Sequence, residues 1–227
     1  MTFECAKIFV ATLAYPYIEP ECEECIDRLV LYSGAKRQAD IVRGITLNSV
    51  SGARARQSAV ARFMDTDCQS IMFIDRDHLF EENALERLFL ADKDIISAIT
   101  TKRRARLAQI NEKPKTTVYD WVDGKIHQYS IEEYKKKEIS EKFQPFKVAY
   151  AGSGISLVKR RVFEAMKKPY FRIPEGKNGD IVGVDVDFCL RAREFGFFTW
   201  VHPEVKALHI GRSYTGLFLW NFDRQTF

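Results

Sequence analysis

The first 100 residues alternate between strand-like and helix-like segments, and this alternation restricts the fold more than any other feature. Apolar, strand-like runs occupy residues 7–13, 41–47, 70–75 and 94–100. The segments between them have apolar residues on one helical face and occupy 20–34, 51–66 and 82–92. Strands that alternate with helices form βαβ units. The pattern therefore predicts an α/β fold with a mostly parallel central sheet flanked by helices.

After residue 100, the sequence predicts a polar insertion in the α/β pattern and then further strands and helices. Residues 101–146 are polar and rich in lysine, and Asp123-Gly124 between two strand-like runs predicts a hairpin. We interpret this stretch as a mobile, partly hairpin excursion and not as a second domain. Beyond it we expect two strands joined by a glycine-rich bend in 146–158, helices at 159–166 and 185–196, and short strands at 198–202 and 205–210. One domain over 1–227 follows, with 212–227 as a C-terminal tail.

Composition narrows the functional class only a little. The 227 residues are 46% hydrophobic and 29% charged, as in a soluble globular protein. The net charge of +4 suits anionic ligands but does not by itself indicate a nucleic-acid binder. No segment reaches the roughly 18 uninterrupted apolar residues of a membrane span, and the N-terminus lacks the pattern of a secretory signal. We therefore expect a cytoplasmic protein without a membrane span.

The five cysteines do not indicate a metal centre. Cys22 and Cys25 form a close pair, but a zinc site would require a second close cysteine pair or a histidine pair, and the sequence has neither. This spacing favours ordinary reduced thiols, while a redox role for the pair stays open.

Two aspartates, Asp75 and Asp77, follow the apolar run that ends the third predicted strand. Ligands of open α/β sheets bind beyond the carboxyl ends of the strands, and residues two apart in extended chain point to the same side. Two such carboxylates repel each other unless a cation lies between them. Magnesium and manganese prefer oxygen ligands and often bind one or two carboxylates together with phosphates. A solvated turn explains the same pair, so both interpretations remain open.

Arg56 lies on the inner face of the second predicted helix. It shares that face with Val60 and Phe63 and is close to the helix start, where the helix dipole favours an anion. The same position also suits an arginine that extends from the first turn to solvent.

Asp185 lies on the apolar face of the predicted helix 185–196, three residues before Phe188. Asp187 falls instead on the polar face. An inward-facing aspartate in the first turn either favours the helix dipole or serves as a general base, and the sequence does not decide between these roles.

Taken in order, these segments resemble the GT-A-fold glycosyltransferases, particularly compact bacterial and phage members similar to family 2 enzymes. The resemblance rests on the helix that carries Arg56, on "FIDRDHLF", and on "AGSGISLVKRRVFEAM", "GVDVDFCLRAREFGF" and "VHPEVKALHIG". It covers most of residues 7–211 and is weakest in 101–146. It implies a cytoplasmic enzyme of a bacterial or phage-infected cell that transfers a sugar from a nucleoside-diphosphate sugar to an acceptor hydroxyl.

The resemblance also implies a divalent metal, manganese or magnesium, and the residues that bind it. Asp75-Arg76-Asp77 corresponds to the DXD motif, in which Asp77 would bind the metal directly. Asp75 would contact the nucleotide ribose, or the metal through water. His209 corresponds to the late histidine that completes the metal site in many members. His78 has no role that the resemblance assigns.

The remaining site residues implied by the resemblance concern the donor and the reaction. Donor binding is implied for Thr12 with the loop after it, for Arg56, and for the bend Gly152-Ser153-Gly154. Asp185 would be the general base, and direct attack by the acceptor would then invert the anomeric centre. Two departures from the family pattern are Gln57 where Asn is usual and Val184 where Glu is usual.

The acceptor stays open between a glycan, a small molecule and modified DNA. The basic runs at 102–106 and 135–137 permit a phage-type enzyme that glycosylates DNA bases, and they also fit a solvated charged loop or an acceptor-binding flap. With Val184, they equally motivate a nucleotide- or nucleic-acid-binding module on a decayed transferase scaffold. A sugar-phosphate nucleotidyltransferase is less favoured, because such enzymes need a glycine-rich loop after the first strand and this chain has no glycine there.

Overall fold

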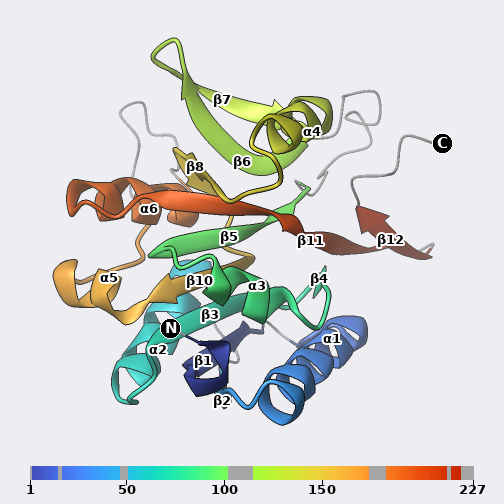
Figure 1. The fold of residues 1–227 in the computed structure, drawn as a ribbon, viewed down its shortest axis with the longest axis vertical. Helices are drawn as coiled ribbons and strands as arrows, with labels where there is room; N and C mark the ends of the chain where they lie inside the picture. The colour runs from blue at the N-terminus through green and yellow to red at the C-terminus, as the bar shows by residue number, and fades with distance from the viewer. Residues whose placement is uncertain are drawn as a thin grey trace.

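The computed structural model describes residues 2–14, 17–46, 51–101, 115–173, 183–213 and 216–220. Within these residues, a nine-stranded sheet forms the body of the molecule, and a three-stranded sheet stands at one end (Figure 1). The expected α/β fold is confirmed.

The central sheet is mainly parallel. Its main path runs β12-β11-β5-β10-β3-β1-β2, formed by β1 (Lys7–Leu13), β2 (Asp40–Thr46), β3 (Ser70–Asp75), β5 (Ile95–Thr100), β10 (Ile155–Lys159), β11 (Thr199–Ser213) and β12 (Gly216–Trp220). Strand β1 is parallel to β2 and β3, and β11 is parallel to β5. On this path β10, between β3 and β5, and the edge strand β12 run the other way. Two short strands off the path also pair antiparallel with β11. The carboxyl ends of β1, β3 and β5 therefore meet at one edge of the sheet.

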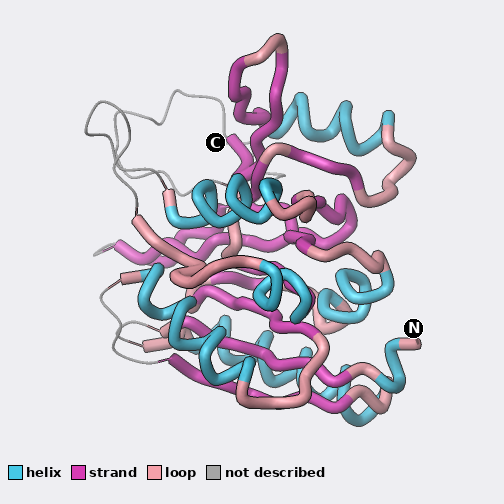
Figure 2. Tube along the Cα trace, turned by 90° about the vertical axis from the view of Figure 1, so that its left-hand side faces the viewer, coloured by secondary structure: helices cyan, strands magenta, loops and turns pink. Residues whose placement is uncertain are grey.

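Helices cover both faces of this sheet (Figure 2). On one face lie α1 (Pro20–Leu31), continued by a π-helical turn at Tyr32–Lys36, and α3 (Ala84–Leu90), near the short 3-10 helix Phe3–Cys5. On the other lie α2 (Gly52–Met64), α5 (Arg160–Ala165) and α6 (Val184–Glu194). Alternate residues of β1 supply the two cores: Ile8 and Val10 pack on the first side, and Phe9 and Ala11 on the second. Among the described residues, no helix is both long and apolar enough to cross a membrane.

The expected hairpin lies in the excursion and comprises β6 (Lys115–Val122) and β7 (Lys125–Ser130). Asp123 and Gly124 form its turn with positive φ angles. A helix that the sequence analysis did not expect, α4 (Ile131–Ser140), follows directly and begins with a capping box of Ser130 and Glu133. Strand β6 also pairs with β9 (Tyr150–Ala151), while β8 (Phe146–Val148) joins β11. The basic run at 102–106 lies outside the described residues.

Strand β11 corrects one expectation. The two short strands predicted at 198–202 and 205–210 are one strand, with a shift of register between Val201 and Lys206. Pro203 lies in the irregular part, and its missing N–H explains why pairing with β5 lapses there and then resumes. The continuous strand extends beyond β5 and pairs with the two-residue strand β4 (His78–Leu79). His209 is thereby brought to the end of β3.

The side chain of Arg160, at the start of α5, stabilises the C-terminal end of α2. Its guanidinium donates hydrogen bonds to the carbonyls of Phe63, Thr66 and Cys68, at 3.0, 2.7 and 2.7 Å. We expect Arg160→Met to lower the free energy of unfolding by about 2–3 kcal/mol, because these carbonyls lose a charged donor. Urea denaturation monitored by circular dichroism measures this change.

Arg161→Met is the matched control. Arg161 is largely exposed and forms an ion pair with Asp94. Exposed pairs contribute little, so the control should change the unfolding free energy by less than about 1 kcal/mol. Equal losses in the two variants would contradict the capping role of Arg160.

Candidate functional site

Arg56 and Asp75 form an ion pair at the carboxyl end of β3, in which Arg56 is buried and the Asp75 side chain is 33% exposed. The Arg56 Nη2 atom donates hydrogen bonds to Asp75 Oδ1 at 2.9 Å and to Oδ2 at 3.1 Å. Burial alone would lower the pKa of the Arg56 guanidinium, but the carboxylates of Asp75 and Asp185 outweigh it and raise that pKa above its ordinary value. The guanidinium therefore stays charged, and its charge is compensated by carboxylates from two other elements.

Asp185, in the first turn of α6, holds the bend between β9 and β10. The backbone N–H of Ser153 donates to Asp185 Oδ2 at 3.2 Å, and the Ser153 hydroxyl donates to Oδ1. The Arg56 Nε atom lies 3.8 Å from the same Oδ1. The Asp185 side chain is nevertheless 33% exposed, so its carboxylate can accept a further hydrogen bond from a ligand.

Asp187 differs from its expected position on the polar face of this helix. Its side chain is buried and accepts hydrogen bonds from Arg172 Nε at 3.0 and 2.9 Å. Arg191 Nη1 lies 3.6 Å away on the next helical turn. The helical period placed Asp187 among polar residues, but Arg172 packs against that face and compensates the buried charge.

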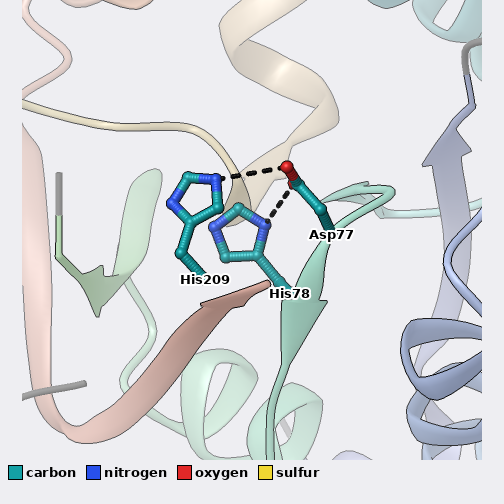
Figure 3. A group of neighbouring side chains, drawn as sticks. All are labelled: Asp77, His78 and His209. Atoms are coloured by element: carbon teal, nitrogen blue, oxygen red, sulfur yellow. Dashed lines mark ion pairs between the residues drawn. The ribbon is translucent and has the colours of Figure 1, made fainter. Parts of the chain in front are cut away.

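The side chains of Asp77, His78 and His209 point toward one another (Figure 3). The His78 Nδ1 atom lies 3.4 Å from Asp77 Oδ1, and His209 Nε2 lies 3.4 Å from Asp77 Oδ2. The two imidazole rings are 4.4 Å apart between centroids. Burial opposes ionisation of Asp77, yet the adjacent imidazoles of His209 and His78 hold the pKa of its carboxyl well below the ordinary value. A carboxylate is thus the stable form at this position.

Strand pairing brings these three side chains together. In the antiparallel pair β4–β11, His78 is the direct partner of His209. The Ile210 N–H donates to the Asp77 carbonyl at 2.8 Å, and His209 Nδ1 lies 3.3 Å from the Thr101 carbonyl. Each ligand atom of the cluster lies within 4.8 Å of the others. The backbone therefore fixes the spacing of the three groups.

The glycines of the bend allow close packing at two points. A Cβ atom on Gly154 would lie 2.6 Å from His78 Cε1 and 2.8 Å from its Nε2, which is too close for any side chain. A Cβ on Gly152 would lie 2.9 Å from the Thr117 Cβ on β6. The Asp75 N–H donates to the Gly154 carbonyl at 2.7 Å. The bend is therefore packed between the histidine cluster and the hairpin.

The donor set of this cluster fits a divalent metal. The His78 side chain is only 2% exposed, and neither of its ring nitrogens makes a hydrogen bond of good geometry within the described structure. Leaving such atoms unsatisfied costs free energy, and a bound ion would satisfy one of them. Two imidazole nitrogens and one carboxylate oxygen suit manganese and similar transition metals better than magnesium, which prefers oxygen ligands alone.

The other predicted site residues take up more varied positions. The Thr12 side chain is buried in β1, as are Leu13 and Ala14 after it, so the Thr12 hydroxyl is not exposed to a ligand. The Gln57 Oε1 atom accepts from the backbone N–H groups of Tyr170 and Phe171 at 2.9 and 3.2 Å, which is a structural role. The Cys22 thiol lies 3.5 Å from the Asp75 carbonyl, and burial raises its pKa to about 12, as for an inert thiol.

Sequence reasoning gave His78 no role, and the structure places it in the cluster. Its position directly after Asp77 was visible in the sequence. Its partner was not, because the pairing joins residues 78 and 209 across most of the chain. A histidine next to the aspartates at a strand end was the available signal.

Comparisons with known proteins identify the fold. No protein-family model and no curated protein matches the chain. A197 from STIV aligns with a TM-score of 0.54 and 18% identity over 95% of this chain and 94% of that chain. GalNAc-T7, solved with UDP, GalNAc and Mn2+, aligns with a TM-score of 0.53 and 10% identity over 92% of this chain. This chain covers 45% of GalNAc-T7, a little under half its length. These alignments support the expected GT-A-like fold.

Gly154→Ala tests the packing of the bend against His78. The added methyl group would displace the imidazole, so we expect a loss of about 1–3 kcal/mol in the free energy of unfolding. The His78 ring signals should also move in proton–nitrogen NMR spectra.

Gly34→Ala is the control, because its Cβ would meet nothing closer than the Ala39 carbonyl at 3.9 Å. It should leave the free energy of unfolding and the NMR signals of the four histidine rings essentially unchanged. An unperturbed His78 signal in Gly154→Ala would show that the ring does not pack against the bend.

Proposed function

We propose that the protein is a metal-dependent glycosyltransferase, similar to family 2 enzymes, with residues 1–227 as one catalytic domain. It would transfer a sugar from a nucleoside-diphosphate sugar to an acceptor hydroxyl. The observation that carries this proposal is the cluster of Asp77, His78 and His209 at the carboxyl end of β3, where ligands of α/β sheets bind. The GT-A-like fold supports it.

Asp77, His78 and His209 would hold the metal, and manganese fits their donor set better than magnesium. When bound, the metal would neutralise the charge that grows on the leaving diphosphate. Asp75 does not belong to the cluster, because Arg56 holds both of its oxygens. Asp75 would contact the ribose, or the metal through water.

Arg56 would act as a positioning residue. Its guanidinium is buried and already bound to Asp75, with Asp185 within 3.8 Å. We therefore assign it the orientation of these two carboxylates, in place of the direct contact with the diphosphate that the sequence suggested. A buried arginine that lost both carboxylates would be left with an uncompensated charge.

Asp185 would be the general base. Ser153 holds the carboxylate by two hydrogen bonds, which fixes its orientation, and the exposed part of the side chain can accept the proton of the acceptor hydroxyl. The Gly152–Gly154 bend, packed beside it, would border the donor sugar. Attack from the side of Asp185 would invert the anomeric centre.

The alternatives have weaker support. A nucleotidyltransferase would need glycines after β1, and residues 13–19 contain none. The hypothesis of DNA-base glycosylation was based on the basic runs in the sequence. Lys137 forms an ion pair with Glu141 at 2.5 Å, so the run at 135–137 does not offer three unpaired charges. A decayed scaffold, suggested by Val184, would bind nucleotide without turnover.

A thermal-shift panel tests the proposal. We expect at least one nucleoside diphosphate or nucleotide sugar to raise the melting temperature only when manganese is present. A ligand at 100 times its dissociation constant stabilises the native state by about 2.7 kcal/mol. The nucleotide sugar found in this way should then release nucleoside diphosphate slowly in a manganese-dependent reaction.

Asp77→Asn should remove both the manganese-dependent shift and the release. Asp67→Asn, which changes an exposed aspartate paired with Lys7, is the control and should keep both. An unchanged rate of nucleoside diphosphate release in Asp77→Asn would contradict the proposal.

His78→Asn tests the third ligand directly. We expect manganese to bind at least about tenfold more weakly, because loss of even an indirect partner of a metal costs that much. Electron paramagnetic resonance of free Mn2+ measures the affinity without substrate. His127→Asn, on the hairpin, should bind manganese like the original protein, and equal affinities in all three proteins would exclude His78 as a ligand.

A further inference from the structure

The β6–β7 hairpin has two different faces. Helix α4 covers one of them, and on the other Tyr119 packs against the core beside α6 while the outer end is exposed. Val118 and Tyr129 lie on the face that packs against Ile131 and Tyr134 of α4. Figures 1 and 2 show α4 beside the hairpin, which projects from the rest of the molecule. The opposite face carries Tyr119, Trp121, Ile126 and Gln128, because side chains alternate along each strand. We call these four residues the aromatic face.

The four residues of the aromatic face are uncharged, and its outer end is apolar and exposed. Trp121 pairs across the strands with Ile126, and these side chains are 47% and 39% exposed. Tyr119 pairs with Gln128, the polar member of the group. Large exposed apolar side chains that adjoin one another mark binding surfaces, whereas single ones do not.

The aromatic face continues toward the candidate site. The Tyr119 ring stacks on Tyr150 of β9, with centroids 4.5 Å apart and planes at 20°. Three residues after Tyr150 along the chain is Ser153, which is hydrogen-bonded to Asp185. At a rise of about 3.3 Å per residue, the stacked tyrosines lie within roughly 10 Å of Ser153. A chain-like ligand with one end at Asp185 would therefore reach Tyr119 and then Trp121.

We propose that the aromatic face binds an uncharged oligosaccharide, the acceptor of the transfer, through the units behind its reacting end. This inference rests on the proposed function and names its acceptor class. Aromatic rings offer flat apolar surface to the C–H faces of sugar rings. The Gln128 Nε2 atom donates to the Thr116 carbonyl at 2.7 Å, and its Oε1 atom can accept a hydrogen bond from a sugar hydroxyl. An extended acceptor is required, because a monosaccharide at Asp185 would not reach Trp121.

The two other classes of partner fit this face less well. A nucleic acid needs cations along its phosphates, and the aromatic face carries none. A stable protein partner needs roughly 800 Å² on each side, far more than two half-exposed side chains provide. An uncharged, narrow aromatic surface beside the site matches an oligosaccharide.

Binding is tested with neutral oligosaccharides of two to six units, built from glucose, galactose, mannose or N-acetylglucosamine, on an array and then by calorimetry. We expect the original protein to bind at least one series, with affinity that increases with length. Trp121→Ala should weaken that binding roughly tenfold, as for an aromatic anchor. Val122→Ala, 45% exposed on the other face of the same strand, is the matched control and should bind normally.

The proposed function is followed separately through the manganese-dependent nucleotide shift, which both variants should retain. No binding of any oligosaccharide, equal affinities in Trp121→Ala and Val122→Ala, or binding only of a single-stranded DNA oligonucleotide would each overturn the inference. If the nucleotide shift persists in that case, the proposed function still stands. Oligosaccharide binding without any nucleotide-dependent change in melting temperature would instead contradict the proposed function. The aromatic face would then remain a glycan-binding surface.

Discussion

The candidate site depends on the interactions of the buried Arg56 guanidinium with two carboxylates. It lies among carboxylates from two other elements, Asp75 at the end of β3 and Asp185 at the start of α6. A buried charge is tolerated only when opposite charge and hydrogen bonds compensate it, so these elements cannot shift independently. Arg160 holds the other end of α2 through backbone carbonyls. The helix that carries Arg56 is therefore anchored at both ends.

The positions of the residues in the histidine cluster are determined by different interactions. Its members are set by backbone pairing between β4 and β11 and by the missing side chain of Gly154. The ring nitrogens of His78 lack good hydrogen bonds within the described residues, which a purely structural histidine would avoid. Proteins break such local rules mainly at functional sites. Under the proposed function, a bound cation would satisfy a ring nitrogen of His78 and compensate the carboxylate of Asp77.

The β6–β7 hairpin and α4 form a unit that lies outside the central sheet and is connected to the region of the candidate site. A small core that includes Val118 and Tyr134 stabilises it. An ion pair between Glu138 of α4 and Lys206 of β11, at 3.0 Å, connects it to the strand that carries His209. The unit thus presents its aromatic face from a fixed position beside the bend. Donor and acceptor regions would share β11 and the Gly152–Gly154 bend as common supports.

Most of the fold and part of the site could be predicted from the sequence, because periodicity, turn residues and strand-end aspartates are local signals. The βαβ elements, the Asp123-Gly124 turn and the position of Asp75 after a buried strand were determined in this way. Only the tertiary structure decided the partner of Arg56, the burial of Asp187 and the place of His78. These depend on contacts between residues far apart in the chain, such as the pairing of His78 with His209. No local pattern encodes which distant segment will lie alongside.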